Sequence, residues 1–412
     1  MKRQIICEDM IVNEKQIVCR YSVNGDELLN SILVAPREFC AIFDEEISEV
    51  PIGILMIPFV SELLPLIWIL DAELIINEID QSFYESISEF KKGYMRMYPD
   101  IDFKGTLTPG RVVANAHSTE RKAVLFSGGV DAFTTLISHI DEKPDLITLW
   151  GADVDFGNED GWKEVKKQVK ETANNFSLHY HIVRTNFRKL IDPVKMRAYM
   201  DTINPKYEWW HDFQHGIGII SHAAPLAYQL GIGTVYIASS FTAADGHYTC
   251  ASDPTIDNHV KFGSANVVHD GYDLNRQMKI HKLCEFSDYF SSNVPIRVCW
   301  KSTGGRNCCH CEKCYRTMMG ILAEGKDPKK LGFDLYNQEN RKHMLRSLRY
   351  NLIAKHHFRR YRYIRDALRS NYTLETCPKD LKWFYQLQIT ENIQWYEKVY
   401  LKIIAKIRKL VK

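Results

Sequence analysis

Five cysteines lie between positions 299 and 314, and four of them are spaced to hold one metal ion. The four are Cys299, Cys308, Cys311 and Cys314, separated by eight, two and two residues. Four thiolates at such spacing can surround one tetrahedral zinc ion at about 2.3 Å, and a site with four protein ligands is closed and structural because no position is left for water. An iron–sulfur cluster and free thiols are the alternatives. Cys309 and His310 can compete as ligands, but only Cys308 gives the even two-residue spacing.

A second chemical signal is a glycine turn after a short apolar run. Residues 123–126 are apolar and predict a buried parallel strand, and Ser127-Gly128-Gly129 turns the chain. Apolar residues at helical spacing follow, beginning at Phe133. Because glycine lets a ligand approach the backbone and the first N–H groups of a helix lack acceptors inside it, this turn suits a phosphate or pyrophosphate. The alternative is an ordinary strand–helix turn that uses glycine for tightness.

The turn closely resembles the PP-loop of N-type ATP pyrophosphatases, which reads SGGxDS. Ser127, Gly128, Gly129 and Asp131 match it, whereas Ala132 stands in place of the last serine. The resemblance implies that Phe126 through Asp131 bind ATP, with one hydroxyl contact to pyrophosphate missing. Thr134 or Thr135 is a candidate substitute for that hydroxyl. The turn is neither a Walker A loop nor a dinucleotide fingerprint, because the Gly-Lys-Ser/Thr and the third glycine are absent.

The residues after the turn alternate between predicted strands and helices. We expect strands over 146–150 and 180–184, with a helix over 161–176 between them, and this order indicates a doubly wound α/β domain. Ligands bind at the carboxyl ends of such strands. In PP-loop proteins the adenine lies there, so the resemblance points to the backbone of Gly151 and Ala152.

A further helix and strand follow Trp209. The helix is expected over 219–230 with a kink at Pro225, and the strand over 234–238. Ser239 and Ser240 lie just past this strand and are candidate ATP contacts. A long polar loop is expected to follow up to Gly271 as a candidate substrate loop; its acidic and imidazole residues, individually typical of turns and caps, are Asp245, His247, Asp253, Asp257, His259, His269 and Asp270. Hydrogen-bonding roles are favoured over metal binding for His211, His215 and His222.

Residues 1–115 predict an α+β domain without a chemical motif. Strand-like runs cover 16–21, 32–35 and 40–43, and a helix is expected over 81–94. The apolar stretch 52–70 contains one charge, Glu62, and is interpreted as buried strand and helix rather than a membrane span. The domain either packs against a partner or closes over a substrate on the next domain.

Composition sets the remaining limits. The 412 residues are 45% hydrophobic and 25% charged, and the formal net charge is +2, so no global nucleic-acid signal exists. From Leu335 onward, however, the sequence contains 18 Lys and Arg residues but only 6 Asp and Glu residues, so this region is basic. The apolar run after Arg3 is too short for a signal peptide, so we expect a cytoplasmic protein in which eleven cysteines indicate metal rather than disulfides.

The basic region is expected to be helical over 341–369 and carries aromatic residues further on. These include Trp383, Phe384, Trp395 and Tyr396. Basic residues interleaved with aromatics can bind nucleic acid or a partner protein. The alternative is a helical cap whose aromatic residues pack on the α/β body.

The turn and the cysteine spacing together resemble 7-cyano-7-deazaguanine synthase over residues 120–325, and the extensions resemble its larger relatives in bacterial antiviral operons. The resemblance implies a PP-loop (HUP-type) domain over 116–330 with a zinc knuckle at 299–314, between the N-terminal α+β domain and a basic helical region over 331–412. It implies ATP, Mg²⁺ and Zn²⁺, with Ser127 donating to phosphate and Asp131 orienting the loop or contacting Mg²⁺. Lys313 and Arg316 either add charge near the phosphates or are exposed helix residues.

The implied reaction is adenylation of the carboxylate of 7-carboxy-7-deazaguanine, followed by attack of an amine. The product is a nitrile, or an amide on a partner protein in antiviral defence. The alternatives are a tRNA-modifying PP-loop enzyme and a nucleotide-binding pseudoenzyme, the latter suggested by Ala132. We expect a homo-oligomer or a heteromeric complex and no membrane partner.

Overall fold

The computed structural model describes residues 2–116, 120–246, 248–289, 294–299, 305–354 and 358–387. His247, Trp395 and Tyr396 lie outside these ranges. The chain divides into two compact units: Met1–Ser127 with Thr135–Asp273, and Gly128–Thr134 with Leu274–Lys412.

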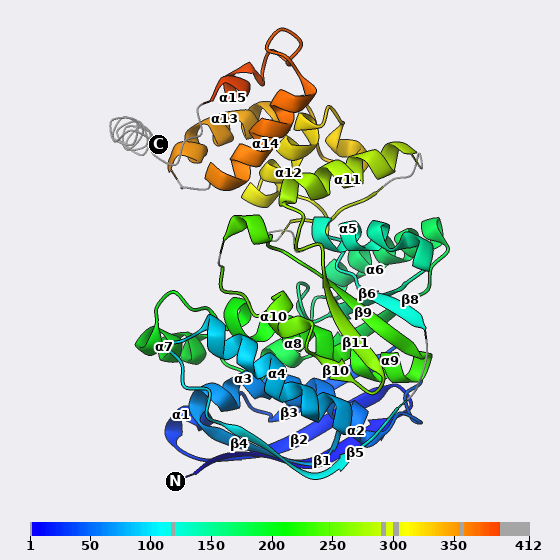
Figure 1. Cartoon of the computed structure of the whole chain (residues 1–412), viewed down its shortest axis with the longest axis vertical. Coiled ribbons are helices and arrows are strands. Elements are labelled where there is room, and N and C mark those ends of the chain that lie inside the picture. Colours follow the sequence, from blue (N-terminus) through cyan, green and yellow to red (C-terminus); the bar gives the residue numbers. More distant parts are fainter. Residues whose placement is uncertain are drawn as a thin grey trace. The chain divides into compact units, whose positions relative to one another are not determined.

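The first unit is built on one mixed, mostly parallel sheet of eleven strands (Figure 1). Its strand order is β10-β11-β9-β6-β7-β8-β3-β2-β1-β4-β5. An α/β fold with a large sheet is thus confirmed. The strand that precedes the glycine turn has a parallel neighbour on each side.

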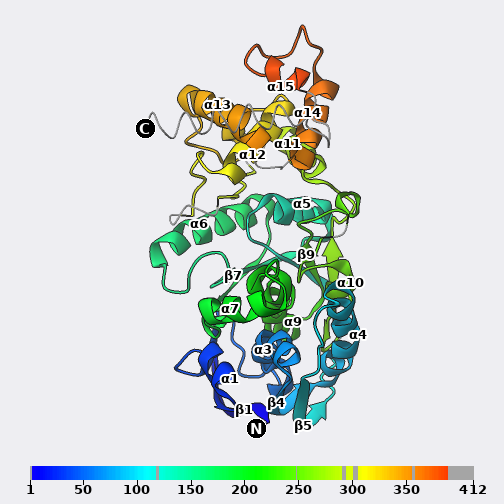
Figure 2. The ribbon, with the colours of Figure 1, turned by 90° about the vertical axis from the view of Figure 1, so that its left-hand side faces the viewer.

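Five parallel strands form one half of the sheet. They are β6 (Arg121–Leu125), β7 (Asp145–Trp150), β8 (Tyr180–Thr185), β9 (Ile232–Ala238) and β11 (Ala265–Asp270). The order β8-β7-β6-β9-β11 reverses direction between β6 and β9, where a crevice for ligands forms in open α/β sheets. Helix α6 (Glu159–Phe176) and helix α9 (Ala224–Leu230) cover opposite faces of this half (Figure 2).

The first 115 residues continue the same sheet. The strands are β1 (Arg3–Asn13), β2 (Gln16–Asn24), β3 (Glu38–Phe43), β4 (Ala72–Asp80) and β5 (Thr106–Val113). β3 pairs antiparallel with β8, with Phe43 opposite Val183, and this pairing joins the two halves. The expected strand at 32–35 is wrong, because Ile32 ends α1 (Glu27–Ile32), which packs against α7 (Pro193–Ile203), and Leu33 forms only an isolated bridge to Ile191.

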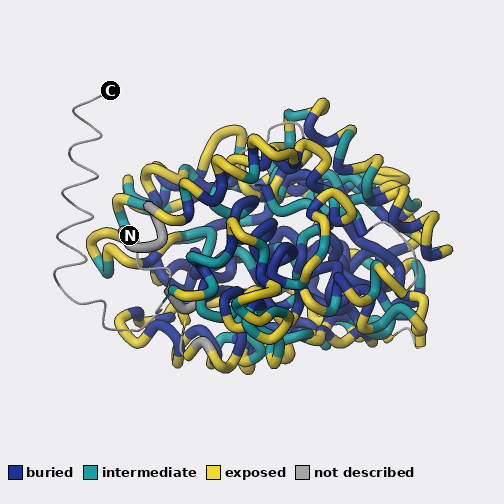
Figure 3. The backbone as a smooth tube through the Cα atoms, turned by 90° about the horizontal axis from the view of Figure 1, so that it is seen from above, coloured by how far each residue is buried: buried dark blue, intermediate teal, exposed yellow. Residues whose placement is uncertain are grey.

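The apolar stretch at 52–70 is helical throughout, so the strand expected there is wrong. It forms α2 (Ile52–Leu55) and α3 (Ile57–Leu70), and every residue of α3 is buried. A helix that is apolar all round is stable only when it is surrounded, and α3 packs against β4, β5 and α8. Buried segments appear dark blue in Figure 3. Within the part of the chain described, no helix has the length and apolarity to cross a membrane.

Helix α4 (Gln81–Met97) contacts both ends of the curled sheet. It packs against β4 and β5 on one side and against β10 (Lys261–Phe262) on the other. Asp80 caps the helix by accepting from the Phe83 N–H at 2.9 Å, and the same oxygen accepts from the Gly263 N–H at 2.9 Å. Since Asp80 is fully buried, one carboxylate ties the helix start to the far end of the sheet.

Residues 209–271 are more regular than the sequence indicates. A π-helical turn (Trp209–Gln214), α8 (His215–Ile220) and a 3₁₀ turn (Ser221–Ala223) precede α9, so Pro225 begins a new helix instead of kinking one. The expected long polar loop contains α10 (Pro254–Asp257), β10 and β11. Alternate residues of β11 are buried in the sheet, but the polar residues between and beside them gave this segment the composition of a loop.

Among its described residues, the second unit is mostly helical. Its helices are α11 (Arg276–Tyr289), α12 (Glu312–Ala323), α13 (Gln338–Ala354), α14 (Phe358–Asn371) and α15 (Lys382–Gln386), with a 3₁₀ turn at Pro328–Leu331. The predicted basic helix over 341–369 is thus two helices.

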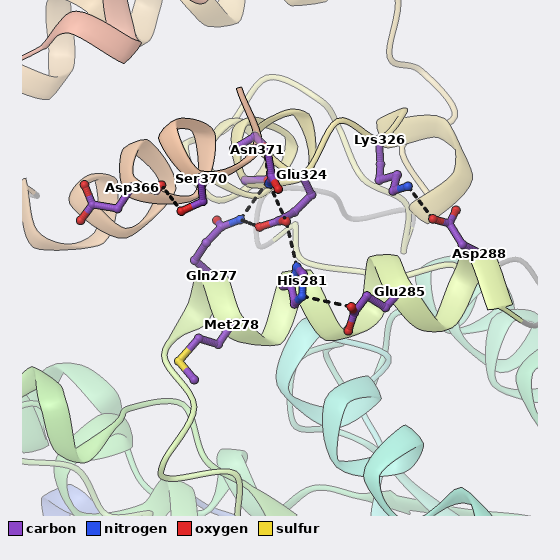
Figure 4. A network of polar contacts seen from close by, with 12 residues as sticks. Gln277, Met278, His281, Glu285, Asp288, Glu324, Lys326, Asp366, Ser370 and Asn371 are labelled. Atoms are coloured by element: carbon purple, nitrogen blue, oxygen red, sulfur yellow. Dashed lines mark hydrogen bonds and ion pairs between the residues drawn. The ribbon is translucent and has the colours of Figure 1, made fainter. Parts of the chain in front are cut away.

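A polar network fastens three of these helices together (Figure 4). Glu324, at the end of α12, accepts from the Gln277 amide through Oε1 at 2.6 Å, and its Oε2 accepts from the Asn371 amide at 3.1 Å and lies 2.9 Å from His281 Nδ1. The Glu324 side chain is 6% exposed. This buried carboxylate therefore fixes α11 and α14 against the helix that carries the last cysteine.

Candidate functional site

The glycine turn is fixed by the neighbouring strand. The Phe126 N–H donates to the Ile147 carbonyl at 2.7 Å, and the Phe126 carbonyl accepts from Thr148 Oγ1 at 2.7 Å. Phe126 is buried, whereas the next residue, Ser127, is exposed. The buried ring anchors the turn, and the serine hydroxyl lies at the surface where a ligand can reach it.

Gly128 adopts a backbone conformation that favours glycine. Its φ is +75°, in the left-handed region, and the Gly129 carbonyl accepts from the Phe133 N–H at 2.9 Å as the first bond of α5 (Val130–Ser138). A side chain at position 128 would be strained. The turn thus leads directly into α5, and the first N–H groups of this helix have no acceptor within the helix.

The two threonine hydroxyls near Ala132 donate within the protein. Thr134 Oγ1 donates to the Val130 carbonyl at 2.8 Å, and Thr135 Oγ1 donates to Asp270 Oδ2 at 2.7 Å. A role for either in place of the hydroxyl missing at Ala132 stays a prediction.

Asp131 binds two cations of α11. Its carboxylate lies 2.9 Å from Arg276 Nη2 and 3.2 Å from Lys279 Nζ, and the Lys279 side chain is 3% exposed. Burial alone would raise the pKa of Asp131, but the charges of Arg276, Lys279 and, further away, Lys313 outweigh it and lower that pKa. The carboxylate is therefore ionised and positions a group of cations.

This arrangement brings together two of the predicted site residues and adds two that sequence reasoning missed. Asp131 and Lys313 are close enough to interact electrostatically. Arg276 and Lys279 were missed; their three-residue spacing puts them on one helix face, but no local pattern indicates the distant Asp131. Arg316 is buried, with Nη1 3.3 Å from Glu312 Oε1, so the interpretation of Arg316 as an exposed helix residue is wrong.

The cysteine cluster is assembled as the spacing predicts. The sulfur atoms of the four predicted residues lie within 4.8 Å of one another; they are those of Cys299, Cys308, Cys311 and Cys314. Cys311 caps α12, since its Sγ accepts from the Cys314 N–H at 3.4 Å. Burial, followed by the neighbouring thiols, raises the pKa of Cys314. The four sulfurs can hold a metal ion, and their mutual distances are compatible with zinc.

The competing residues are turned away from the cluster. Cys309 is in the left-handed region with φ +54° and its thiol points to the Asn307 carbonyl at 3.8 Å. His310 Nε2 lies 3.2 Å from the Asn340 amide nitrogen. The set that contains Cys308 is therefore the one the backbone assembles.

One segment connects the cluster to the glycine turn. The Arg297 N–H, two residues before Cys299, donates to the Gly128 carbonyl at 2.7 Å. Asn307 holds the same segment, because its Oδ1 accepts from the Val298 N–H at 2.9 Å and its amide donates to the Ile296 and Gly332 carbonyls at 2.7 and 2.8 Å. A metal at the cysteines would thus stabilise the backbone that touches the turn.

The other predicted ATP contacts lie at the carboxyl edge of the sheet. Gly151, after β7, has φ +124°, and a side chain there would meet the Thr185 carbonyl at 1.9 Å. The Gly151 N–H donates to the Val154 carbonyl at 3.0 Å, and the Ala152 carbonyl accepts from Arg188 Nη1 at 2.7 Å. These backbone groups are occupied within the fold.

The two serines after β9 differ in accessibility. Ser239 is buried and its Oγ donates to the Phe241 carbonyl at 2.6 Å, whereas Ser240 is exposed. Because β9 lies next to β6, Ser240 follows the same edge as Ser127. Of these two serines, Ser240 is the better candidate for a ligand contact.

Four other polar candidates make contacts within the fold. His222 is fully buried between the Gly218 carbonyl (2.7 Å) and Thr185 Oγ1 (2.9 Å), and burial lowers its pKa to about 4. Asp253 caps α10 through the Thr255 N–H. Asp257 and His269 form a buried pair at 2.8 Å. These contacts favour the hydrogen-bonding interpretation over metal binding for His222.

Several arginines of the basic region bind within the region itself. Arg341 makes a two-pronged ion pair with Asp380 at 2.6 and 2.9 Å, and the Arg369 guanidinium donates to the Tyr385 carbonyl at 2.8 Å. Arg349 lies over the Trp383 ring at 5.8 Å. In the described part of this region, these charges thus hold helices together.

The comparisons with known proteins add no relative. No family model, curated protein or solved structure matches the chain.

Proposed function

We propose that this protein activates a carboxylate with ATP, forming an acyl-adenylate that an amine then converts to an amide; where the amine is ammonia, a second ATP would activate the amide oxygen so that it leaves and a nitrile forms. The substrate class that the resemblance of the turn and the cysteines favours is a 7-carboxy-7-deazaguanine. The observation that carries the proposal is the group of cations around Asp131, immediately after the turn: Arg276 and the buried Lys279 form ion pairs with it, and Lys313 interacts with it electrostatically.

In the first step, a carboxylate oxygen of the substrate attacks the α-phosphorus of ATP. The bond to the bridging oxygen breaks and pyrophosphate leaves with the electron pair. The turn's N–H groups and the helix dipole stabilise the developing negative charge, and Ser127 donates a hydroxyl hydrogen bond. Lys279 and Lys313 add positive charge that Asp131 positions, so Asp131 acts by orientation.

In the second step, an amine nitrogen attacks the acyl carbon, the amine loses a proton and AMP leaves. The acceptor is either ammonia or an amine of a partner protein. Mg²⁺ would supply charge neutralisation on the phosphates, and zinc at the four cysteines would supply a structural cross-link. The contacts expected from Gly151, Ala152 and Ser240 to ATP stay predictions.

The direct test is turnover with defined reactants. Full-length protein is incubated with ATP, Mg²⁺ and 7-carboxy-7-deazaguanine, with and without ammonia, and mass spectrometry follows AMP and the base. AMP with a nitrile indicates a synthase, whereas AMP with a mass shift on a co-expressed protein indicates a conjugating enzyme. Lys279→Met should abolish the formation of AMP and of either product. Lys330→Met, which replaces an exposed lysine in the same way, is the control and should leave both unchanged.

A second function, nucleotide binding without turnover, is favoured by one observation. Ala132 lacks the last hydroxyl of the PP-loop pattern, and the Thr134 and Thr135 hydroxyls donate to other groups of the protein. ATP binding without pyrophosphate exchange, in the presence of the carboxylate, would favour this function and contradict the enzyme.

A further inference from the structure

A group of metal-binding side chains lies where β3 ends and β8 begins, apart from the cysteines. Asp44 and Glu45 follow β3, and His181 is the second residue of β8. One carboxylate oxygen from each acid and one ring nitrogen of the histidine lie within 4.8 Å of one another. Carboxylate oxygen and imidazole nitrogen are the ligands of many divalent first-row metals.

His181 is oriented as metal-bound histidines are. Its side chain is 5% exposed, with Nδ1 3.0 Å from Glu45 Oε1 and Nε2 3.3 Å from Asp145 Oδ2. Asp145 is 2% exposed and lies 2.8 Å from Arg121 Nη2. A ligating histidine commonly gives its second nitrogen to a carboxylate, which fixes the ring. The buried Asp145 supplies that support, so Nδ1 is the nitrogen available to a metal.

The Asp44 carboxylate is held at the strand junction by the main chain of β8. Asp44 Oδ2 accepts from the Ile182 N–H at 2.9 Å, which fixes the carboxylate against β8. Lys15 donates to the Asp44 main-chain carbonyl rather than to a carboxylate. Among the described residues, neither Asp44 nor Glu45 forms an ion pair with lysine or arginine.

Charge therefore favours a divalent ion here. Arg121 pairs with Asp145, which leaves Asp44 and Glu45 without a lysine or arginine partner among the described residues. A divalent cation would neutralise both and would replace the proton between His181 Nδ1 and Glu45 Oε1.

We propose that Asp44, Glu45 and His181 Nδ1 bind one divalent first-row metal ion, with water completing its coordination. The ion would join the end of β3 to the start of β8, the antiparallel pairing that links the two halves of the sheet. Its oxygen and nitrogen ligands distinguish it from the thiolate site, which prefers softer metals.

The test uses Mn²⁺ as the probe, on full-length protein purified in zinc and without nucleotide. Electron paramagnetic resonance counts bound Mn²⁺, and electron spin-echo modulation detects a coordinated ¹⁴N nucleus. The wild-type protein should bind one Mn²⁺ with a nitrogen coupling. Bound Mn²⁺ without that coupling would overturn the assignment of His181.

Variants at the exposed side of the site keep the test independent of folding. Glu45→Gln and Asp44→Asn should each weaken Mn²⁺ binding at least tenfold, and Asp145→Asn should weaken it roughly 10- to 100-fold through the histidine. Glu46→Gln, an exposed neighbour, is the matched control and should bind as the wild type does. Equal binding by Glu45→Gln, Asp44→Asn and Glu46→Gln would overturn the proposal.

Discussion

Lys279 and Asp131 form an ion pair with 3.2 Å between Nζ and Oδ1, and the lysine side chain is 3% exposed. Replacing one member of a buried pair leaves the other charge without compensation, at a cost of about 3–5 kcal/mol. Asp131→Asn removes the negative charge that pairs with both Lys279 and Arg276, so we expect a loss of about 3 kcal/mol or more in the free energy of unfolding. Urea denaturation measures it.

The double variant distinguishes this pair from unrelated losses. If the two charges compensate each other, Asp131→Asn/Lys279→Met should be less destabilised than the sum of the single variants. Strict additivity would show that the pair contributes no coupling energy.

Ser127 and Ser239 should respond differently to loss of their hydroxyls. Ser127 is exposed beside the turn, so Ser127→Ala should reduce ATP–pyrophosphate exchange about tenfold, the effect of one hydrogen bond to a charged group, with stability unchanged. Ser239→Ala removes the buried donor to the Phe241 carbonyl and should lower the free energy of unfolding by about 1–2 kcal/mol. Wild-type exchange in Ser127→Ala would contradict its phosphate role.

Adjacent cysteines provide a matched pair for the metal site. Cys308→Ser removes a member of the four-sulfur cluster, whereas Cys309→Ser changes a thiol that points to the Asn307 carbonyl. Elemental analysis should find one zinc per chain in the wild type and in Cys309→Ser, and less in Cys308→Ser. A chelator should lower the melting temperature of the first two only. Equal zinc content in both variants would exclude the assigned set.

His222 should make the protein sensitive to mild acid. Its pKa is lowered from 6.5 to about 4 by burial, so between these values the unfolded chain binds a proton that the folded protein does not. Stability therefore falls as pH falls from 6.5 to 4, by roughly 3 kcal/mol from this residue. His222→Gln should lose less stability over the same range, as measured by urea denaturation at each pH. Parallel pH profiles would show that His222 does not titrate in this way.

Local sequence patterns predicted the helices and strands that are determined by residues close together in the sequence. The amphipathic spacing of Trp162, Val165 and Val169 predicted α6, and the apolar runs predicted β6, β7 and β9. The cysteine cluster was also predictable, because three of its members lie within seven residues and the first turn of α12 positions two of them.

The other elements and contacts depend on residues that are far away in the sequence. The stretch 52–70 is equally apolar as strand or helix, and the surrounding sheet selects the helix. β11 was hidden because Asn266, His269 and Asp270 gave it the composition of a loop, although its parallel pairing with β9 buries alternate residues. The role of Lys279 depends on its ion pair with Asp131, which lies 148 residues earlier in the sequence. No local sequence pattern indicates that contact.

The pairing of β3 with β8 has a consequence for synthesis on the ribosome. The edge of Ala41–Phe43 that faces β8 finds its partner only when residues 183–185 have emerged, about 140 residues later. At translation rates of about 5–20 residues per second, the β3 edge stays unpaired for on the order of 10 s. An unpaired edge is a template for association with other chains, so the nascent protein exposes a strand edge prone to aggregation during that interval.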